Sequence, residues 1–72
     1  MYKIIVRIFP KNRRASFSSK EIAIDSKSPT VLDLFNSLND LSIGDYFVSR
    51  GTTIIGPSEQ LVNGETLNIM PK

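Results

Sequence analysis

Ser16, Ser18 and Ser19 are candidate nucleophiles that lie close together in this sequence. A serine needs a general base to become nucleophilic, and histidine, the usual base near neutral pH, is absent from the 72 residues. Cysteine is absent as well, which removes thiolate metal sites and disulfides. We therefore expect no catalytic residue, no cofactor and no enzyme activity.

The acidic residues do not have the spacing of a metal site. A calcium loop needs several oxygen ligands at alternate positions within about 12 residues. Asp33 has a helix-capping role instead, and Asp40 and Asp45 flank loops. The sequence therefore predicts no metal site among the carboxylates of Asp25, Asp33, Asp40, Asp45, Glu59 and Glu65.

The strongest cluster of positive charge contains Lys11, Arg13 and Arg14. These cations could grip phosphates or an acidic partner, with Phe9 or Phe17 available to stack on a base. Charge runs are ordinary on loops, however, which favours a solvated hairpin tip. The net charge of only +2 also argues against nucleic acid, because such binding needs many phosphate contacts.

An alternation of apolar residues predicts the first element that must position these side chains. Residues 2–9 have the period of two that marks a strand with one solvated face. A polar hairpin connection follows over residues 10–19, and a second strand is expected over residues 20–25. In the first strand the core face consists of Tyr2, Ile4, Val6 and Ile8, and the opposite face of Lys3, Ile5, Arg7 and Phe9.

A short amphipathic helix is predicted to begin after Thr30. Thr30 and Asp33, three residues later, form the pattern of a capping box. Apolar residues then recur at helical spacing, and Asn39, Asp40 and Gly44 are expected to end the helix. The apolar stripe consists of Val31, Leu34, Phe35 and Leu38, with Leu41 as an optional last member.

Three further strands are expected, over residues 46–49, 52–55 and 66–70. Gly51 and Gly64 are expected to be turn residues. The order β-β-α-β-β-β describes a single α+β domain over residues 1–72. Its mixed sheet has four to five strands, the first and last strands are parallel, and one helix packs across one face.

Leu61 is expected to plug the core from a bend. On strand 46–49 two orientations stay open, because either Phe47 or the pair Tyr46 and Val48 could face inward. The core is expected to contain Ile4, Val6, Ile22, Ile24, Leu34, Leu38, Leu67 and Ile69.

Three stretches share features with a known group of proteins. They are residues 28–35 (Ser-Pro-Thr-Val-Leu-Asp-Leu-Phe), 47–52 (Phe-Val-Ser-Arg-Gly-Thr) and 61–71 (Leu-Val-Asn-Gly-Glu-Thr-Leu-Asn-Ile-Met-Pro). They resemble the helix start, the strand-turn-strand and the final strand of the ubiquitin-like β-grasp superfamily. The resemblance is strongest to its sulfur-carrier group, the small subunit of molybdopterin synthase (MoaD) and the thiamine sulfur carrier (ThiS). It implies a β-grasp fold over nearly the whole chain.

The resemblance does not extend to the residues that carry the group's chemistry. Sulfur carriers and ubiquitin-type modifiers end in Gly-Gly, which an activating enzyme threads through a narrow tunnel to adenylate the carboxylate. Glycine fits there because it has no side chain. Here residues 70–72 are Met-Pro-Lys, in which proline fixes φ and lysine adds bulk. A sulfur carrier or modifier with an atypical C-terminus is therefore an alternative, not the leading hypothesis.

The sheet face turned away from the predicted helix is the candidate partner-binding surface. Ile5, Arg7 and Phe9 lie on it, and Met70 joins them if the last strand pairs beside the first. An apolar patch with a basic rim suits another protein, with Phe9 and Arg7 as the expected anchors. The alternatives are scattered surface apolar residues without a function and a homodimer through this face.

We therefore expect a non-catalytic, ubiquitin-like protein-interaction module whose partner is another protein of unknown identity. A sulfur carrier or modifier and a small nucleic-acid-associated protein are the alternatives. No apolar run approaches the roughly 18 residues that span a bilayer, and the N-terminus lacks a signal-peptide core. We expect no membrane partner and a cytoplasmic location.

Overall fold

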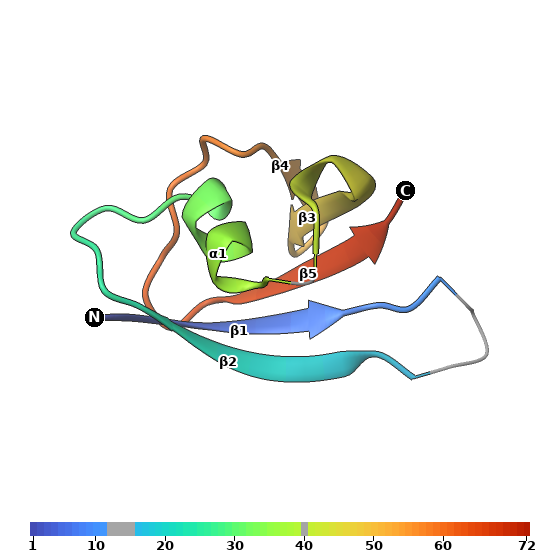
Figure 1. Cartoon of the computed structure of the whole chain (residues 1–72), viewed down its shortest axis with the longest axis horizontal. Coiled ribbons are helices and arrows are strands. Elements are labelled where there is room, and N and C mark those ends of the chain that lie inside the picture. Colours follow the sequence, from blue (N-terminus) through green and yellow to red (C-terminus); the bar gives the residue numbers. More distant parts are fainter. Residues whose placement is uncertain (12–15, 40) are drawn as a thin grey trace.

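The computed structural model describes residues 1–11, 16–39 and 41–72. Among these residues one α-helix lies against one face of a five-stranded sheet (Figure 1). The elements are β1 (Tyr2–Ile8), β2 (Ser18–Ile24), α1 (Val31–Ser37), the 3-10 helix η1 (Ile43–Asp45), β3 (Tyr46–Arg50), β4 (Thr53–Ile55) and β5 (Thr66–Pro71).

The sheet is mixed, with the strand order β2-β1-β5-β3-β4. The first and last strands, β1 and β5, run parallel side by side, and the other neighbouring strands are antiparallel. The chain is thus a small α+β domain with a five-stranded mixed sheet and one α-helix, which confirms the expected class and element order. Within the described residues α1 covers one face of the sheet, and no helix lies on the other face (Figure 1).

The predicted capping box begins α1. The backbone N–H of Thr30 donates to Asp33 Oδ2 at 2.8 Å, and the N–H of Asp33 donates to the Thr30 hydroxyl at 3.5 Å. The helix is shorter than predicted and ends at Ser37. Asn36 and Ser37 are weak helix formers, and the Ser37 hydroxyl donates to the Asp33 carbonyl at 3.4 Å. Gly44 does not end the helix but lies in η1.

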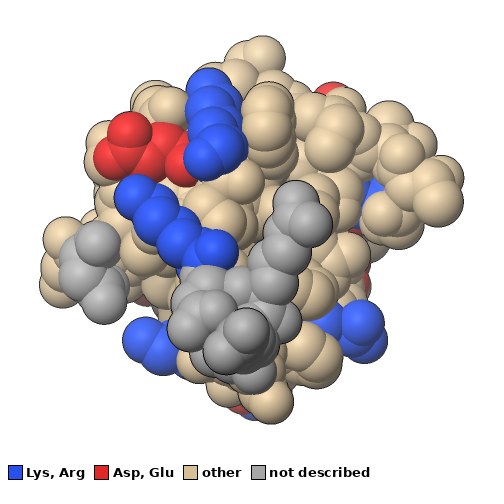
Figure 2. Space-filling model, turned by 90° about the vertical axis from the view of Figure 1, so that its right-hand side faces the viewer, with Lys and Arg blue, Asp and Glu red and all other residues tan. Residues whose placement is uncertain are grey.

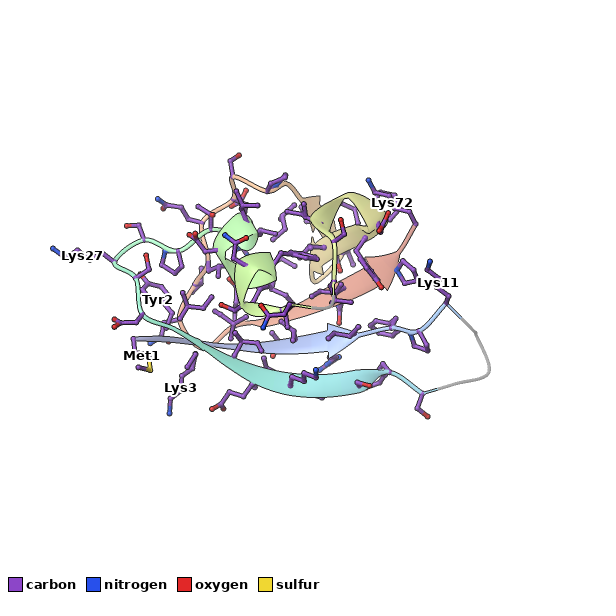
Figure 3. All side chains as sticks on the ribbon, in the orientation of Figure 1. Met1, Tyr2, Lys3, Lys11, Lys27 and Lys72 are labelled. Carbon is purple, nitrogen blue, oxygen red and sulfur yellow. The ribbon has the colours of Figure 1, made fainter. Side chains whose placement is uncertain are left out.

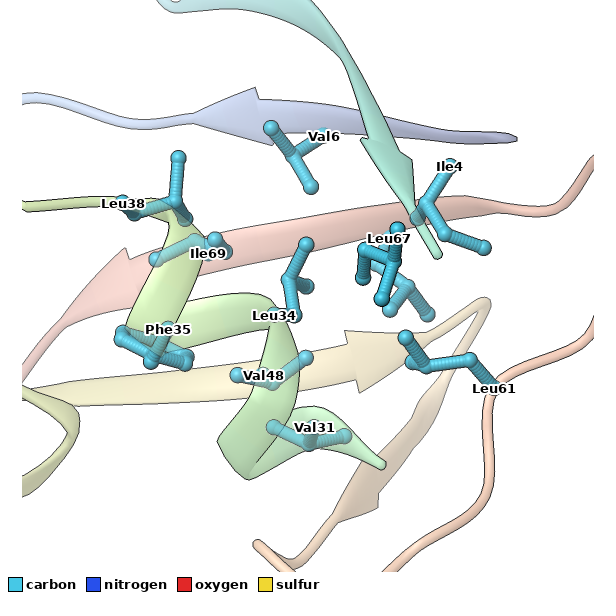
Figure 4. Close-up of a cluster of buried hydrophobic side chains, with 11 residues drawn as sticks. Ile4, Val6, Val31, Leu34, Phe35, Leu38, Val48, Leu61, Leu67 and Ile69 are labelled. Atoms are coloured by element: carbon cyan, nitrogen blue, oxygen red, sulfur yellow. The ribbon is translucent and has the colours of Figure 1, made fainter. Parts of the chain in front are cut away.

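The hydrophobic core lies between α1 and the sheet (Figure 4). Leu61 is buried in this core, as predicted from the sequence. The prediction that Ile22 is buried was wrong, because β2 is an edge strand with a neighbour on one side only, and Ile22 is half-buried. The buried apolar side chains are Ile4, Val6, Ile24, Val31, Leu34, Phe35, Leu38, Val48, Leu61, Leu67 and Ile69.

Strand β3 turns Val48 toward the core and Phe47 away from it. Val48 lies opposite the buried Ile69 of β5, and directly opposite residues point to the same face. Phe47 is paired with Met70 and is 45% exposed. The sheet register therefore decides the orientation that the sequence leaves open.

The β1–β2 hairpin extends beyond the helix. The seven residues of α1 span about 10 Å, whereas the seven residues of β1 span about 23 Å. The ends of β1 and β2 next to their connection therefore project past the helix (Figure 1). β2 begins at Ser18, two residues before the expected start, because Ser18 pairs with Ile8.

Candidate functional site

Three aromatic rings and one methionine form a line across the uncovered face of the sheet. Phe9 and Phe17 are in contact, with their ring centroids 5.2 Å apart. The N–H of Phe9 donates to the carbonyl of Ile69 at 2.9 Å, which places Phe9 beside the next residue of β5, Met70. Met70 in turn lies opposite Phe47 on β3. We call Phe17, Phe9, Met70 and Phe47 the aromatic row.

The aromatic row is accessible to a partner. Phe17 is 47% exposed and Phe47 is 45% exposed, while Phe9 and Met70 between them are half-buried. The row crosses four neighbouring strands, which places its ends about 14 Å apart. The row therefore presents exposed aromatic rings at both of its ends.

A cation lies against the aromatic ring at each end of the row. The guanidinium carbon of Arg7 is 5.8 Å from the centroid of Phe17, and the ammonium of Lys72 is 5.3 Å from the centroid of Phe47. Such contacts hold the cation over the ring face and keep it near the apolar surface. Figure 2 views the molecule from the end that contains Lys72, and Lys and Arg side chains lie at several places around that end.

The predicted binding residues are brought together only in part. Arg7, Phe9 and Met70 meet in or beside the aromatic row. Ile5 is on the same face and 38% exposed, but it lies opposite Thr66, away from the row. Of the basic hairpin residues Lys11 is exposed and lies toward the same end of the molecule as Lys72 (Figure 3). The other two hairpin residues, Arg13 and Arg14, lie outside the described residues.

A polar pair lies next to the aromatic row on the same face. Asn68 of β5 is opposite Ser49 of β3, and its side-chain amide donates to the Ser49 hydroxyl at 3.4 Å. Ser49 is 4% exposed, and the Asn68 Oδ1 atom is buried with no hydrogen-bond partner among the described residues. A buried carbonyl oxygen without a donor lowers stability, so this pair is a local weakness of the sheet.

The strongest ionic cluster is structural. Arg50, at the end of β3, contacts both Glu59 and Glu65, at 3.2 and 2.7 Å, and donates to the Gln60 carbonyl at 2.9 Å. Glu65 also accepts from the Val62 N–H at 2.6 Å. Hydrogen bonding to Glu65 raises the pKa of Arg50 above its usual value. The cluster ties the loop before β5 to the sheet, and four of the five guanidinium N–H groups of Arg50 donate within it.

The part of the chain that the structure describes contains neither a cluster of metal-binding side chains nor a membrane-spanning helix. No three or more acidic side chains gather in a way that could hold a metal ion. Within the same residues, no helix has both the length and the apolar character needed to cross a membrane.

Comparisons with protein-family models, with curated proteins and with solved structures found no match.

Sequence reasoning missed Lys72, left the orientation of Phe47 open and did not place Phe17 on this face. The places of Phe17 and Phe47 in the row depend on the start of β2 and on the register of β3, both set by non-local pairing. Lys72 contacts Phe47 because its backbone N–H donates to the Asp45 carbonyl at 3.0 Å. The one signal in the sequence was the clustering of Phe9 and Phe17 around a hairpin connection.

Proposed function

We propose that this chain is a non-catalytic protein-interaction module that binds another protein through the aromatic row. The observation that carries the proposal is the exposed line of Phe17, Phe9, Met70 and Phe47 with a cation at each end. Aromatic residues, methionine and arginine are enriched at protein interfaces, and large exposed apolar patches mark interaction sites. Aromatic side chains have few rotatable bonds, so fixing them on binding costs little conformational entropy.

The positive charges at the two ends of the row indicate what kind of surface the partner presents. Arg7 and Lys72 would oppose acidic side chains, and the rings between them would pack on an apolar centre. The partner is therefore a protein surface with an apolar strip about 14 Å long and carboxylates at its two ends. Arg7 and Phe9 are the expected anchors, since Arg7 contacts Phe17 and Phe9 lies inside the row.

The fold supports membership of the ubiquitin-like β-grasp superfamily as part of this proposal. A single helix on a mixed sheet, with parallel β1 and β5 side by side, is the arrangement that the resemblance implies. Sulfur transfer is not part of this proposal. Met70 and Pro71 lie in β5, and the Lys72 N–H is bonded to Asp45.

The test combines affinity capture with matched variants. The immobilised chain is used to isolate partners, and the affinity of each purified partner is then measured by calorimetry. We expect Phe17→Ala and Arg7→Glu each to weaken binding about tenfold or more, as anchors do. Leu32→Ala is the control for Phe17, because both side chains are 47% exposed and Leu32 is on the helix. Lys27→Glu is the charge-reversal control and lies at the other end of the molecule (Figure 3).

Two outcomes would contradict the proposal. One is undiminished binding by the Phe17 and Arg7 variants together with loss of binding when Lys11, Arg13 and Arg14 are changed, which would assign the function to the hairpin. The other is a dimer of the free protein in sedimentation that dissociates on Phe17→Ala. In that case the row is the interface between two copies. Circular dichroism and melting temperature should stay unchanged in every variant.

A further inference from the structure

A small apolar groove opens where β3 and β4 separate, next to the start of α1. Its volume is about 160 Å³. The walls come from the first residue of α1, from η1, from both strands and from the loop that follows β4. The lining residues are Val31, Ile43, Tyr46, Phe47, Val48, Ile54, Ile55, Pro57 and Lys72.

Backbone hydrogen bonds hold the walls of the groove in place. The N–H of Leu32 donates to the carbonyl of Pro57 at 3.1 Å, which fixes the loop after β4 against α1. On the other side the N–H of Lys72 donates to the carbonyl of Asp45 at 3.0 Å, which fixes residue 72 against η1. The groove is thus preformed, and a ligand would not have to order its walls.

The volume restricts what the groove can hold. Pockets for drug-sized ligands have about 300–1,000 Å³, which is well above this value. An apolar cavity of about 150 Å³ holds one benzene molecule. The groove therefore has the size of a single phenyl ring or branched aliphatic side chain.

One charged side chain lines the groove among these nine residues, and it is Lys72. Its ammonium lies 5.3 Å from the centroid of the Phe47 ring, which is also part of the wall. Within the described residues Lys72 forms no ion pair with an acidic side chain. A carboxylate bound beside the groove would therefore find an opposite charge next to an apolar wall.

We infer that this groove binds one large apolar side chain of a partner peptide that carries a carboxylate on a neighbouring residue. The apolar side chain fills the space that the lining residues enclose, and the carboxylate pairs with Lys72. The groove adjoins the Phe47 end of the aromatic row and shares Phe47 and Lys72 with it, and the inference goes beyond the function proposed for the row.

The test is a titration of the isotope-labelled domain with a short capped peptide, followed by nuclear magnetic resonance. The probe is acetyl-Gly-Asp-Phe-Asp-Gly-amide, for which we expect a Kd of order 1 mM and shifts at Ile43, Val48 and Ile54. Replacing the peptide's phenylalanine with alanine should abolish the shifts. Replacing its aspartates with asparagine, or Lys72→Gln in the domain, should weaken binding about two- to fivefold.

Matched variants separate this site from the aromatic row. Ile54→Asp should abolish peptide binding, and Val62→Asp should not, although both native side chains are 57% exposed. Ile54→Thr, a milder change that suits an edge strand, should weaken binding and guards against misfolding of the aspartate variant. Phe17→Ala should leave peptide binding unchanged. Shifts that persist with the alanine peptide or with Ile54→Asp, or an absence of shifts with the phenylalanine peptide, would overturn the inference.

Discussion

Arg50 and Glu65, 15 residues apart in the chain, form a bidentate ion pair. Arg50 Nε lies 2.7 Å from Glu65 Oε1, and Arg50 Nη2 lies 3.1 Å from Glu65 Oε2. The Glu65 side chain is only 10% exposed, whereas that of Arg50 is 34% exposed. Planar double contacts of this kind are stronger than ordinary surface ion pairs, and this one fastens the loop before β5 to the end of β3.

The first prediction tests this ion pair. Glu65→Gln keeps the shape of the side chain but removes its charge, and we expect it to lower the free energy of unfolding by about 1–2 kcal/mol. Glu59→Gln is the control, because Glu59 makes one contact with Arg50 at 3.2 Å and is 45% exposed. Its effect should stay below about 0.5 kcal/mol in urea unfolding. Equal losses of unfolding free energy in the two variants would show that the second contact between Arg50 and Glu65 adds nothing to stability.

The second prediction concerns the core. Leu34 is completely buried beneath α1, and Leu32, two residues earlier on the same helix, is 47% exposed. Leu34→Ala should cost about 2–5 kcal/mol, which is enough to unfold a domain of this size in part or in full. Leu32→Ala should change stability by less than about 0.5 kcal/mol. If thermal unfolding ranked the two variants the other way, the helix register would be wrong.

Local patterns in the sequence were enough to predict most of the fold. The alternation in β1, the capping box at Thr30 and the apolar stripe of α1 each depend on residues a few positions apart, and each was confirmed. Features set by distant pairing were not predictable in this way. The start of β2 depends on the pairing of Ser18 with Ile8, and the orientation of β3 depends on the pairing of Val48 with Ile69.

The candidate surface was predictable to a smaller degree. Arg7 and Phe9 could be placed on the uncovered face from the period of β1 alone, and Met70 followed from the pairing expected for the last strand. Phe47 could not, because apolar residues occupy both faces of β3. Exposure alone would not have selected the row either, since Ile5 on the same face stands apart from it.

The third prediction concerns two glycines with equally open surroundings. A Cβ atom added at Gly64 or at Gly44 would meet nothing within 4 Å, so neither substitution causes a clash. Gly64, however, has a φ of 85°, which non-glycine residues adopt at a cost of about 1–2 kcal/mol. Gly64→Ala should therefore lower the melting temperature by roughly 4–16 °C, and Gly44→Ala should leave it nearly unchanged. A similar response of the two variants in calorimetry would contradict the backbone explanation.

The last prediction compares two asparagines whose side-chain oxygens have opposite surroundings. Asn63 Oδ1 accepts a hydrogen bond from the Lys3 N–H at 2.9 Å, so Asn63→Val should destabilise the domain by about 0.5–1.5 kcal/mol. Asn68 Oδ1 is buried, and among the described residues it has no donor.

Asn68→Val removes that buried oxygen and places a β-branched residue in β5, so it should raise the free energy of unfolding by about 1 kcal/mol. The Ser49 hydroxyl loses its bond from Asn68 in this variant, but that bond is long, at 3.4 Å, and contributes little. Urea unfolding measures the change in the free energy of unfolding for both variants. If Asn68→Val lowered stability as Asn63→Val is expected to do, the Asn68 oxygen would have to be satisfied in solution, and the polar pair beside the aromatic row would be a support of the sheet instead of a weakness.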